Sequence, residues 1–276
     1  MTQIIAHRGA RSIAPENTII AAEIARIIGA DLWETDINVT SDGHMIIFHD
    51  DHLLRTTNAK TIFSHNNTFC LDEFDLSQIQ MLDTGTAFIE TDPFGEIAAG
   101  NVSTQYLESF RGEKVPTLEE VLNYTQEKQW TVNLELKELS VKLKKFPLPQ
   151  MVVEMIRRMK IDPELIIISS FNHAWLKEVQ ILFPELEVQA LVGYDLGHEM
   201  LWSNYCFDTY NINSDMISME EITKLKNMGK KVNIFTVNKK EDMVQYINAG
   251  VDGIFTDYPQ IMKKLLCTLH LPFHNV

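Results

Sequence analysis

The chain has 276 residues, of which 45% are hydrophobic and 22% are charged, a composition typical of a globular protein with a sizeable core. Its formal net charge of −14 argues against nucleic-acid binding through a basic surface and against docking on anionic lipid by charge alone. The three cysteines fit no zinc pattern, no run approaches the roughly 20 apolar residues of a membrane helix, and no basic leader precedes the first apolar run, so we expect a cytoplasmic protein.

Nine short apolar runs, many rich in β-branched residues, predict β-strands. They are residues 3–7, 32–39, 44–49, 131–137, 165–170, 187–193, 209–213, 231–237 and 253–257. Amphipathic stretches between many of them predict helices, among them residues 17–30, 117–128 and 218–230. The first of these helices is expected to stop at Gly29. The other two begin with Thr117 and Ser218, each followed three residues later by a glutamate, which is the pattern of a capping box.

Strands that alternate with helices predict βαβ units and a parallel sheet. A closed TIM (β/α)8 barrel needs about eight such units and ~250 residues, which this chain supplies. Because nine runs are present, we expect one of them to lie in an extra hairpin or not to be a strand. An open doubly wound sheet is the alternative, but no GxGxxG follows the first predicted strand.

One region interrupts this alternation. From about residue 51 to residue 116 the helical periodicity is poor, and glycine, proline, asparagine, aspartate and threonine are frequent. This composition predicts an insertion after the third predicted strand, and insertions of a barrel most often cover the active-site mouth. We therefore expect one domain over 1–276, with an insertion subdomain at about 51–116.

Polar residues stand at the ends of four predicted strands, where a barrel places its active site. They are His7, Arg8, Glu34, Asp36, His49, Glu135 and Lys137. Each alone has an ordinary explanation, such as a solvent-facing carboxylate or a cross-strand charge pair. Strands of a parallel barrel are, however, buried on both faces and are almost wholly apolar, so charges inside them indicate a functional cluster.

These residue types suit one kind of chemistry. Glu34 and Asp36 point to the same face of their strand, and three carboxylates without a cysteine suit a hard cation, Mg²⁺ or Ca²⁺. Arg8 and Lys137 suit a phosphate group. Two histidines suit a general base and a general acid near neutral pH. The set predicts metal-assisted cleavage of a phosphodiester.

The chain closely resembles the glycerophosphodiester phosphodiesterase family over nearly its whole length. The motifs that carry the likeness follow the family's order: "AHRGARSIAPENT", "WETDINVTSDGHMIIFHDDHLLRTTN", "GEKVPTLEEVL", "NLELK", "SSFN", "FTVN" and "VDGIFTDYP". The resemblance implies a TIM barrel that hydrolyses glycerophosphodiesters to sn-glycerol 3-phosphate and an alcohol with one divalent cation. The implied roles are cation binding by Glu34, Asp36 and Glu135, acid–base catalysis by His7 and His49, and phosphate contact by Arg8 and Lys137.

Three further residues are candidates for the surroundings of the site. Glu16 and Asn17 belong to the "PENT" stretch, and Glu16 either orients a catalytic group or acts as an acid at the start of a helix. Phe235 stands in "FTVN" where many relatives have tryptophan, and it either walls a glycerol pocket or packs in the core. The segment after His49 departs from the family pattern, which leaves the alcohol of the substrate open.

Other functions on the same barrel remain as alternatives. A lysophospholipase D-like or sphingomyelinase D-like enzyme needs an apolar mouth that faces a membrane, and no amphipathic membrane segment is visible. A catalytically silent binding module conflicts with the intact set of seven residues. A Schiff-base enzyme that uses Lys137 conflicts with the three neighbouring acids. We expect a small-molecule substrate, no nucleic-acid partner, no stable membrane insertion, and a monomer or homodimer.

Overall fold

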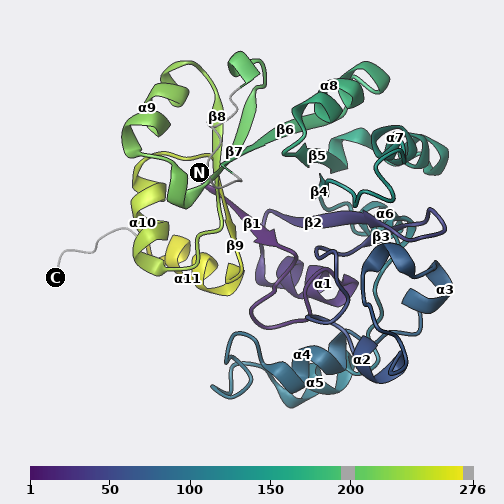
Figure 1. Cartoon of the computed structure of the whole chain (residues 1–276). Helices are drawn as coiled ribbons and strands as arrows, with labels where there is room; N and C mark the ends of the chain where they lie inside the picture. The colour runs from purple at the N-terminus through teal and green to yellow at the C-terminus, as the bar shows by residue number, and fades with distance from the viewer. Residues whose placement is uncertain (194–202, 270–276) are drawn as a thin grey trace.

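The computed structural model describes residues 1–193 and 203–269. In these residues nine strands form one sheet, and most of this sheet closes into a barrel (Figure 1). Eight parallel strands make the barrel, as the sequence predicts: β1 (Gln3–His7), β2 (Leu32–Val39), β4 (Val132–Leu136), β5 (Ile166–Ser170), β6 (Glu187–Val192), β7 (Thr209–Asn213), β8 (Lys231–Phe235) and β9 (Gly253–Thr256). Pairing of β1 with both β2 and β9 closes the ring. The prediction of a (β/α)8 barrel is confirmed.

The ninth strand, β3 (Met45–Ile47), lies outside the ring. It pairs antiparallel with β2, with Ile37 opposite Ile47. The expectation that one predicted strand belongs to an extra hairpin is therefore confirmed. The insertion that follows β3 consequently lies in the connection after the second barrel strand.

Helices surround the barrel, and several begin at the caps that the sequence predicts. They are α1 (Ile19–Ile28), α6 (Leu118–Lys128), α7 (Leu148–Met159), α8 (His173–Leu182), α9 (Met219–Asn227), α10 (Lys240–Asn248) and α11 (Pro259–Leu269). Thr18 caps the start of α1, and Gly29 ends it in a left-handed conformation. Both predicted capping boxes form, at Thr117 for α6 and at Ser218 for α9. Short 3₁₀ turns occupy Leu71–Glu73, Pro163–Leu165, Ser203–Tyr205 and Ser214–Met216.

The insertion contains more helix than its sequence suggests. Its helices are α2 (Ala59–Ile62), α3 (Leu76–Ile79), α4 (Gly85–Thr91) and α5 (Thr104–Phe110). They are grouped on one side of the barrel, away from α9 and α10 (Figure 1). Each has only four to seven residues, too few to show a clear amphipathic period, which explains why the sequence reading missed them.

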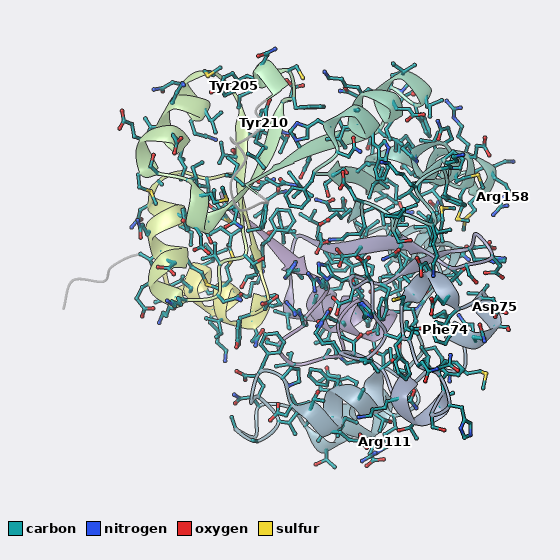
Figure 2. The ribbon with its side chains drawn as sticks, in the orientation of Figure 1. Phe74, Asp75, Arg111, Arg158, Tyr205 and Tyr210 are labelled. Carbon is teal, nitrogen blue, oxygen red and sulfur yellow. The ribbon has the colours of Figure 1, made fainter. Side chains whose placement is uncertain are left out.

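A small hydrophobic cluster lies under the insertion and is separate from the main core. It consists of Ile46, Phe48, Leu53, Ala59, Leu71, Phe74, Ile79, Leu82 and Val115. The ring of Phe74 lies 4.9 Å from that of Phe63, and the neighbouring Asp75 closes a capping box on α3. Figure 2 labels Phe74 and Asp75, with Arg111 elsewhere on the insertion. The cluster includes β3 and Phe48, so it supports the chain that leads into His49.

The main core fills the space between the barrel strands and the outer helices. Trp33 on β2 is fully buried and meets Tyr124 of α6 edge-on, with the ring centroids 6.5 Å apart. No helix of the described residues combines the length and the apolar character needed to cross a bilayer.

The turn after β1 depends on a glycine. Gly9 has φ +83°, and a Cβ at this position would lie 2.7 Å from the carbonyl carbon of Ala21 on α1. L-residues rarely adopt this φ, and the α1 backbone cannot move away without moving the helix. Gly9 therefore lets α1 pack against the turn that follows His7.

We predict that Gly9→Ala lowers the free energy of unfolding more than Gly95→Ala does. Gly95 also has a positive φ of +71°, but no described atom lies within 4 Å of its Cβ position. Gly95→Ala should therefore cost only the backbone strain, about 1–2 kcal/mol, whereas Gly9→Ala should cost roughly 1–3 kcal/mol more from overpacking. Urea unfolding of both variants measures the difference, and equal losses would contradict the close packing of Gly9.

Candidate active site

The end of β1 places a histidine and an arginine at the mouth of the barrel. The Nδ1 atom of His7 lies 2.6 Å from Oδ1 of Asp257, which directly follows β9. A carboxylate can only accept a hydrogen bond, so Nδ1 carries the proton and Nε2 is the free nitrogen of the neutral ring. This Nε2 lies 4.0 Å from Glu34. Burial, together with the charge of Arg8, lowers the pKa of His7, which favours its neutral form.

The three predicted cation ligands meet between β2 and β4. Asp36 pairs in register with Glu135, and Glu34 lies two residues before Asp36 on the same face. One oxygen from each of the three carboxylates lies within 4.8 Å of the others. The Oε1 atom of Glu34 is buried and has no hydrogen-bond partner among the described residues. An orphaned carboxylate oxygen in such a cluster fits a hard divalent cation.

The electrostatics of the cluster also favour a cation. Burial, and then the neighbouring charges of Asp36 and Glu135, raises the pKa of Glu34 well above its usual value. The pKa of Glu135 is raised by burial as well, although Lys137 opposes this. Arg8 acts against burial to hold the pKa of Asp36 below its usual range. The protein thus leaves part of the negative charge uncompensated, which a divalent cation would complete.

Positive and polar groups lie around these carboxylates. The Nε atom of Arg8 lies 3.1 Å from Asp36, and Nζ of Lys137 lies 3.1 Å from Glu135. Asn17 donates a hydrogen bond of 2.9 Å from its side-chain nitrogen to Asp36. The structure therefore places Asn17 beside the cluster. Arg8 and Lys137 both line the cavity described below.

His49 reaches the site from the β3 side and has a carboxylate partner of its own. Its Nδ1 lies 2.6 Å from Oδ1 of Asp50. Arg55 of the insertion then donates from Nε to the other oxygen of Asp50 at 2.6 Å. As with His7, the carboxylate fixes a proton on Nδ1, so Nε2 is the ring nitrogen outside this pair.

A cavity of about 390 Å³ brings the predicted residues together. Six of the seven line it: His7, Arg8, Glu34, His49, Glu135 and Lys137. Asp36 is the seventh and is almost fully buried. Phe235 also lines the cavity, and its ring lies 6.0 Å from that of Phe171 and 6.3 Å from that of Phe255. One part of the cavity is thus charged and another is aromatic.

Glu16 does not line this cavity but lies among three arginines, one of which, Arg8, does line it. Its side chain is only 9% exposed and accepts hydrogen bonds from Arg8, Arg11 and Arg55. Hydrogen bonds and charges from these arginines outweigh burial and hold its pKa well below the usual value. Glu16 is therefore ionised and does not itself transfer protons near neutral pH.

Sequence reasoning assigned no role to four residues that the structure places beside the predicted groups: Arg11, Asp50, Arg55 and Asp257. Two of them could have been found from their positions in the sequence, since Asp50 directly follows His49 and Asp257 follows the last strand. Arg55 had no such local signal, because one of its two partners, Glu16, lies in a different connection of the barrel.

The chain is similar in sequence to known proteins of one family. The model of the glycerophosphoryl diester phosphodiesterase family matches residues 7–261. A glycerophosphodiester phosphodiesterase of Caldanaerobacter subterraneus is 34% identical, over 96% of this chain and 98% of its own. A glycerophosphodiester phosphodiesterase of Bacillus altitudinis is 31% identical, over 96% and 98% of the two chains.

Two solved structures are also similar. A putative glycerophosphoryl diester phosphodiesterase from Silicibacter pomeroyi superposes with a TM-score of 0.79 at 25% identity, covering 98% of this chain and 95% of its own. A phosphodiesterase from Oleispira antarctica, solved in complex with the product sn-glycerol 3-phosphate, has a TM-score of 0.76 at 25% identity and covers 97% of both chains.

We predict that Mg²⁺ or Ca²⁺ raises the melting temperature of the protein, and more at pH 8 than at pH 5. The raised pKa of Glu34 means that the cation-free fold is stabilised at low pH and loses that stability as pH rises through this pKa. A bound cation offsets the loss of stability that ionisation of Glu34 causes. Thermal unfolding in EDTA and in each cation, at both pH values, measures the effect, and equal shifts at the two pH values would contradict it.

Glu34→Gln gives a matched test without any activity measurement. In EDTA at pH 8 the variant should melt above the wild type by about 2–4 °C, the shift that roughly 1 kcal/mol produces in a large domain. It should also lose the response to cations. Glu119→Gln, at an exposed carboxylate on α6, is the control and should keep that response.

Proposed function

The chain belongs to the glycerophosphoryl diester phosphodiesterase family, and we propose that its cavity catalyses phosphodiester hydrolysis with a divalent cation and two histidines. The protein is a glycerophosphodiester phosphodiesterase, which converts glycerophosphodiesters to sn-glycerol 3-phosphate and an alcohol. The observation that carries the proposal is the shared cavity. Two carboxylates of the cluster of three, Glu34 and Glu135, line it together with two histidines whose Nδ1 atoms are each bound to an aspartate.

Glu34, Asp36 and Glu135 would hold the cation, either Mg²⁺ or Ca²⁺. When bound, it supplies neutralisation of the carboxylates and polarisation of the non-bridging phosphate oxygens. Arg8 and Lys137 bind and orient the same phosphate, Arg8 through its planar guanidinium and Lys137 as a point charge.

The two histidines transfer protons on opposite sides of the phosphate. Burial lowers the pKa of His7, which favours its neutral form. This form suits the general base, which accepts a proton at Nε2 from the nucleophile, either water or the glycerol 2-hydroxyl. His49 also lines an adjoining groove of about 480 Å³ beyond the cavity. That position suits the general acid, which in its doubly protonated form gives the Nε2 proton to the departing alcohol and keeps its Nδ1 proton on Asp50.

The same proposal assigns the surroundings of the site. Phe235, together with Phe171, forms an apolar wall for the glycerol carbons. Asn17 keeps Asp36 oriented through its hydrogen bond. In this proposal the chain is one domain over 1–276 with the insertion at about 51–116. It acts as a monomer or homodimer in the cytoplasm, where free cysteines such as Cys70 stay reduced.

We predict that the purified protein releases sn-glycerol 3-phosphate from glycerophosphocholine. Release should stop in EDTA and return with Mg²⁺ or Ca²⁺, because the carboxylate cluster is incomplete without a cation. A coupled assay for glycerol 3-phosphate measures this, and ³¹P NMR of the reaction detects any cyclic phosphate. Activity on lysophosphatidylcholine, with none on glycerophosphocholine, would contradict the proposed substrate class.

We predict that His7→Ala and His49→Ala each lower kcat by about 10²–10⁴-fold, the usual contribution of general acid–base catalysis. Neither should change the melting temperature strongly, since both rings line the cavity rather than fill the core. Steady-state kinetics and thermal unfolding on the same preparations test this. A folded variant with near wild-type kcat would remove that histidine from the mechanism.

A further inference from the structure

Glu16 is linked to both histidine–aspartate pairs, in each case through an arginine. We propose that Glu16 is a positioning residue for both histidines at once, acting through Arg11 on one side and through Arg55 on the other. The inference rests on the proposed function, in which His7 and His49 transfer protons. It adds that the two rings share one support, although they come from different connections of the barrel.

The first arm leads from Glu16 to His7. Arg11 donates from Nε to Oε2 of Glu16 at 2.7 Å, and from Nη1 to Oδ1 of Asp257 at 3.3 Å. That same Oδ1 accepts the hydrogen bond from Nδ1 of His7 at 2.6 Å. The position of Arg11 therefore affects the oxygen that orients the imidazole.

The second arm leads from Glu16 to His49. Arg55 donates from Nη1 and Nη2 to the two oxygens of Glu16, at 2.8 and 2.7 Å. It also donates from Nε and Nη2 to the two oxygens of Asp50, at 2.6 and 2.9 Å. Arg55 thus makes paired contacts on both sides, and Asp50 receives the Nδ1 proton of His49.

The charge of Glu16 holds this arrangement together. Three guanidinium groups converge on one carboxylate, and without its charge they would repel one another, most strongly at Arg8 and Arg11, whose side chains are less exposed than that of Arg55. Arg11 and Arg55 would then move, and Asp257 and Asp50 would follow. A displacement of about 1 Å at a reacting group can reduce a rate by a factor of about 10².

Glu16 also contacts Arg8, which is a proposed phosphate ligand, so an effect through Arg8 must be separated from one through the histidines. Arg8 keeps a second partner, Asp36, at 3.1 Å. A loss that acts through phosphate binding raises KM, whereas a loss that acts through proton transfer lowers kcat. The ratio of the two effects therefore tells which route Glu16 uses.

The main test is Glu16→Gln, which keeps the shape of the side chain and removes its charge. We expect kcat to fall by about 10–100-fold, the usual cost of losing a supporting group, with KM changed less than about threefold. Glu23→Gln is the matched control, because Glu23 also pairs with an arginine, Arg26, but on the outer face of α1. It should keep the wild-type kcat.

A spectroscopic measurement follows each ring directly. In protein labelled with ¹⁵N-histidine, the Nδ1 protons of His7 and His49 should give separate low-field signals, because each is bound to a carboxylate. Arg11→Met should shift the His7 signal alone, Arg55→Met the His49 signal alone, and Glu16→Gln both. Unchanged signals in Glu16→Gln, or a kcat within twofold of wild type, would overturn the proposal.

Glu16→Asp covers the case in which Glu16→Gln does not fold. It keeps the charge among the arginines but is one methylene shorter, so it cannot reach Arg11 and Arg55 together, and kcat should still fall by about tenfold. Full activity in this variant would also overturn the proposal. His7→Ala and His49→Ala, assayed alongside, separate the catalytic role of the histidines from the positioning role of Glu16. If both histidine variants lose activity while the Glu16 variants do not, only the positioning role is overturned.

Discussion

The burial of three carboxylates within 4.8 Å of one another is the constraint on which the rest of the site depends. Like charges in such a place are costly unless opposite charges surround them. Layers of side chains with alternating positive and negative charge extend outward from the cluster. After the carboxylates come Arg8 and Lys137, then Glu16, then Arg11 and Arg55, and then Asp50 and Asp257 with their histidines. Compensation of charge and orientation of the histidines are therefore one network.

The sequence was sufficient to predict the centre of this network. A parallel barrel strand has no exposed face, so the carboxylates of Glu34 and Asp36 inside β2 indicated a charged partner or an ion. Their spacing of two residues placed both side chains on the same face of the strand. The barrel itself followed from the alternation of strands and helices. The caps of α6 and α9 followed from patterns of four residues, which are local and therefore readable.

The outer layers could not be predicted in the same way. Arg55 and Glu16 are 39 residues apart, and their contact depends on how the insertion folds against the β1–α1 turn. The insertion is built from helices too short to show a period, and it is held by a cluster that includes β3. Tertiary contacts of this kind have no signature in a local pattern. This is why Arg55 was missed, and with it the contact of Arg11 with Asp257, 246 residues away, while Arg8 was found.

The bond between His7 and Asp257 joins residues that are 250 positions apart, one on the first strand and one just after the last. The pair can form only when β9 docks against β1, which is also the step that completes the ring. Catalytic competence is therefore tied to one of the least local contacts of the fold, for which the entropy of closing a long loop must be overcome. During synthesis the histidine emerges almost first and its aspartate almost last. All three carboxylates are thus synthesised well before the aspartate that orients His7, and the pair that proton transfer requires forms only once the barrel is whole.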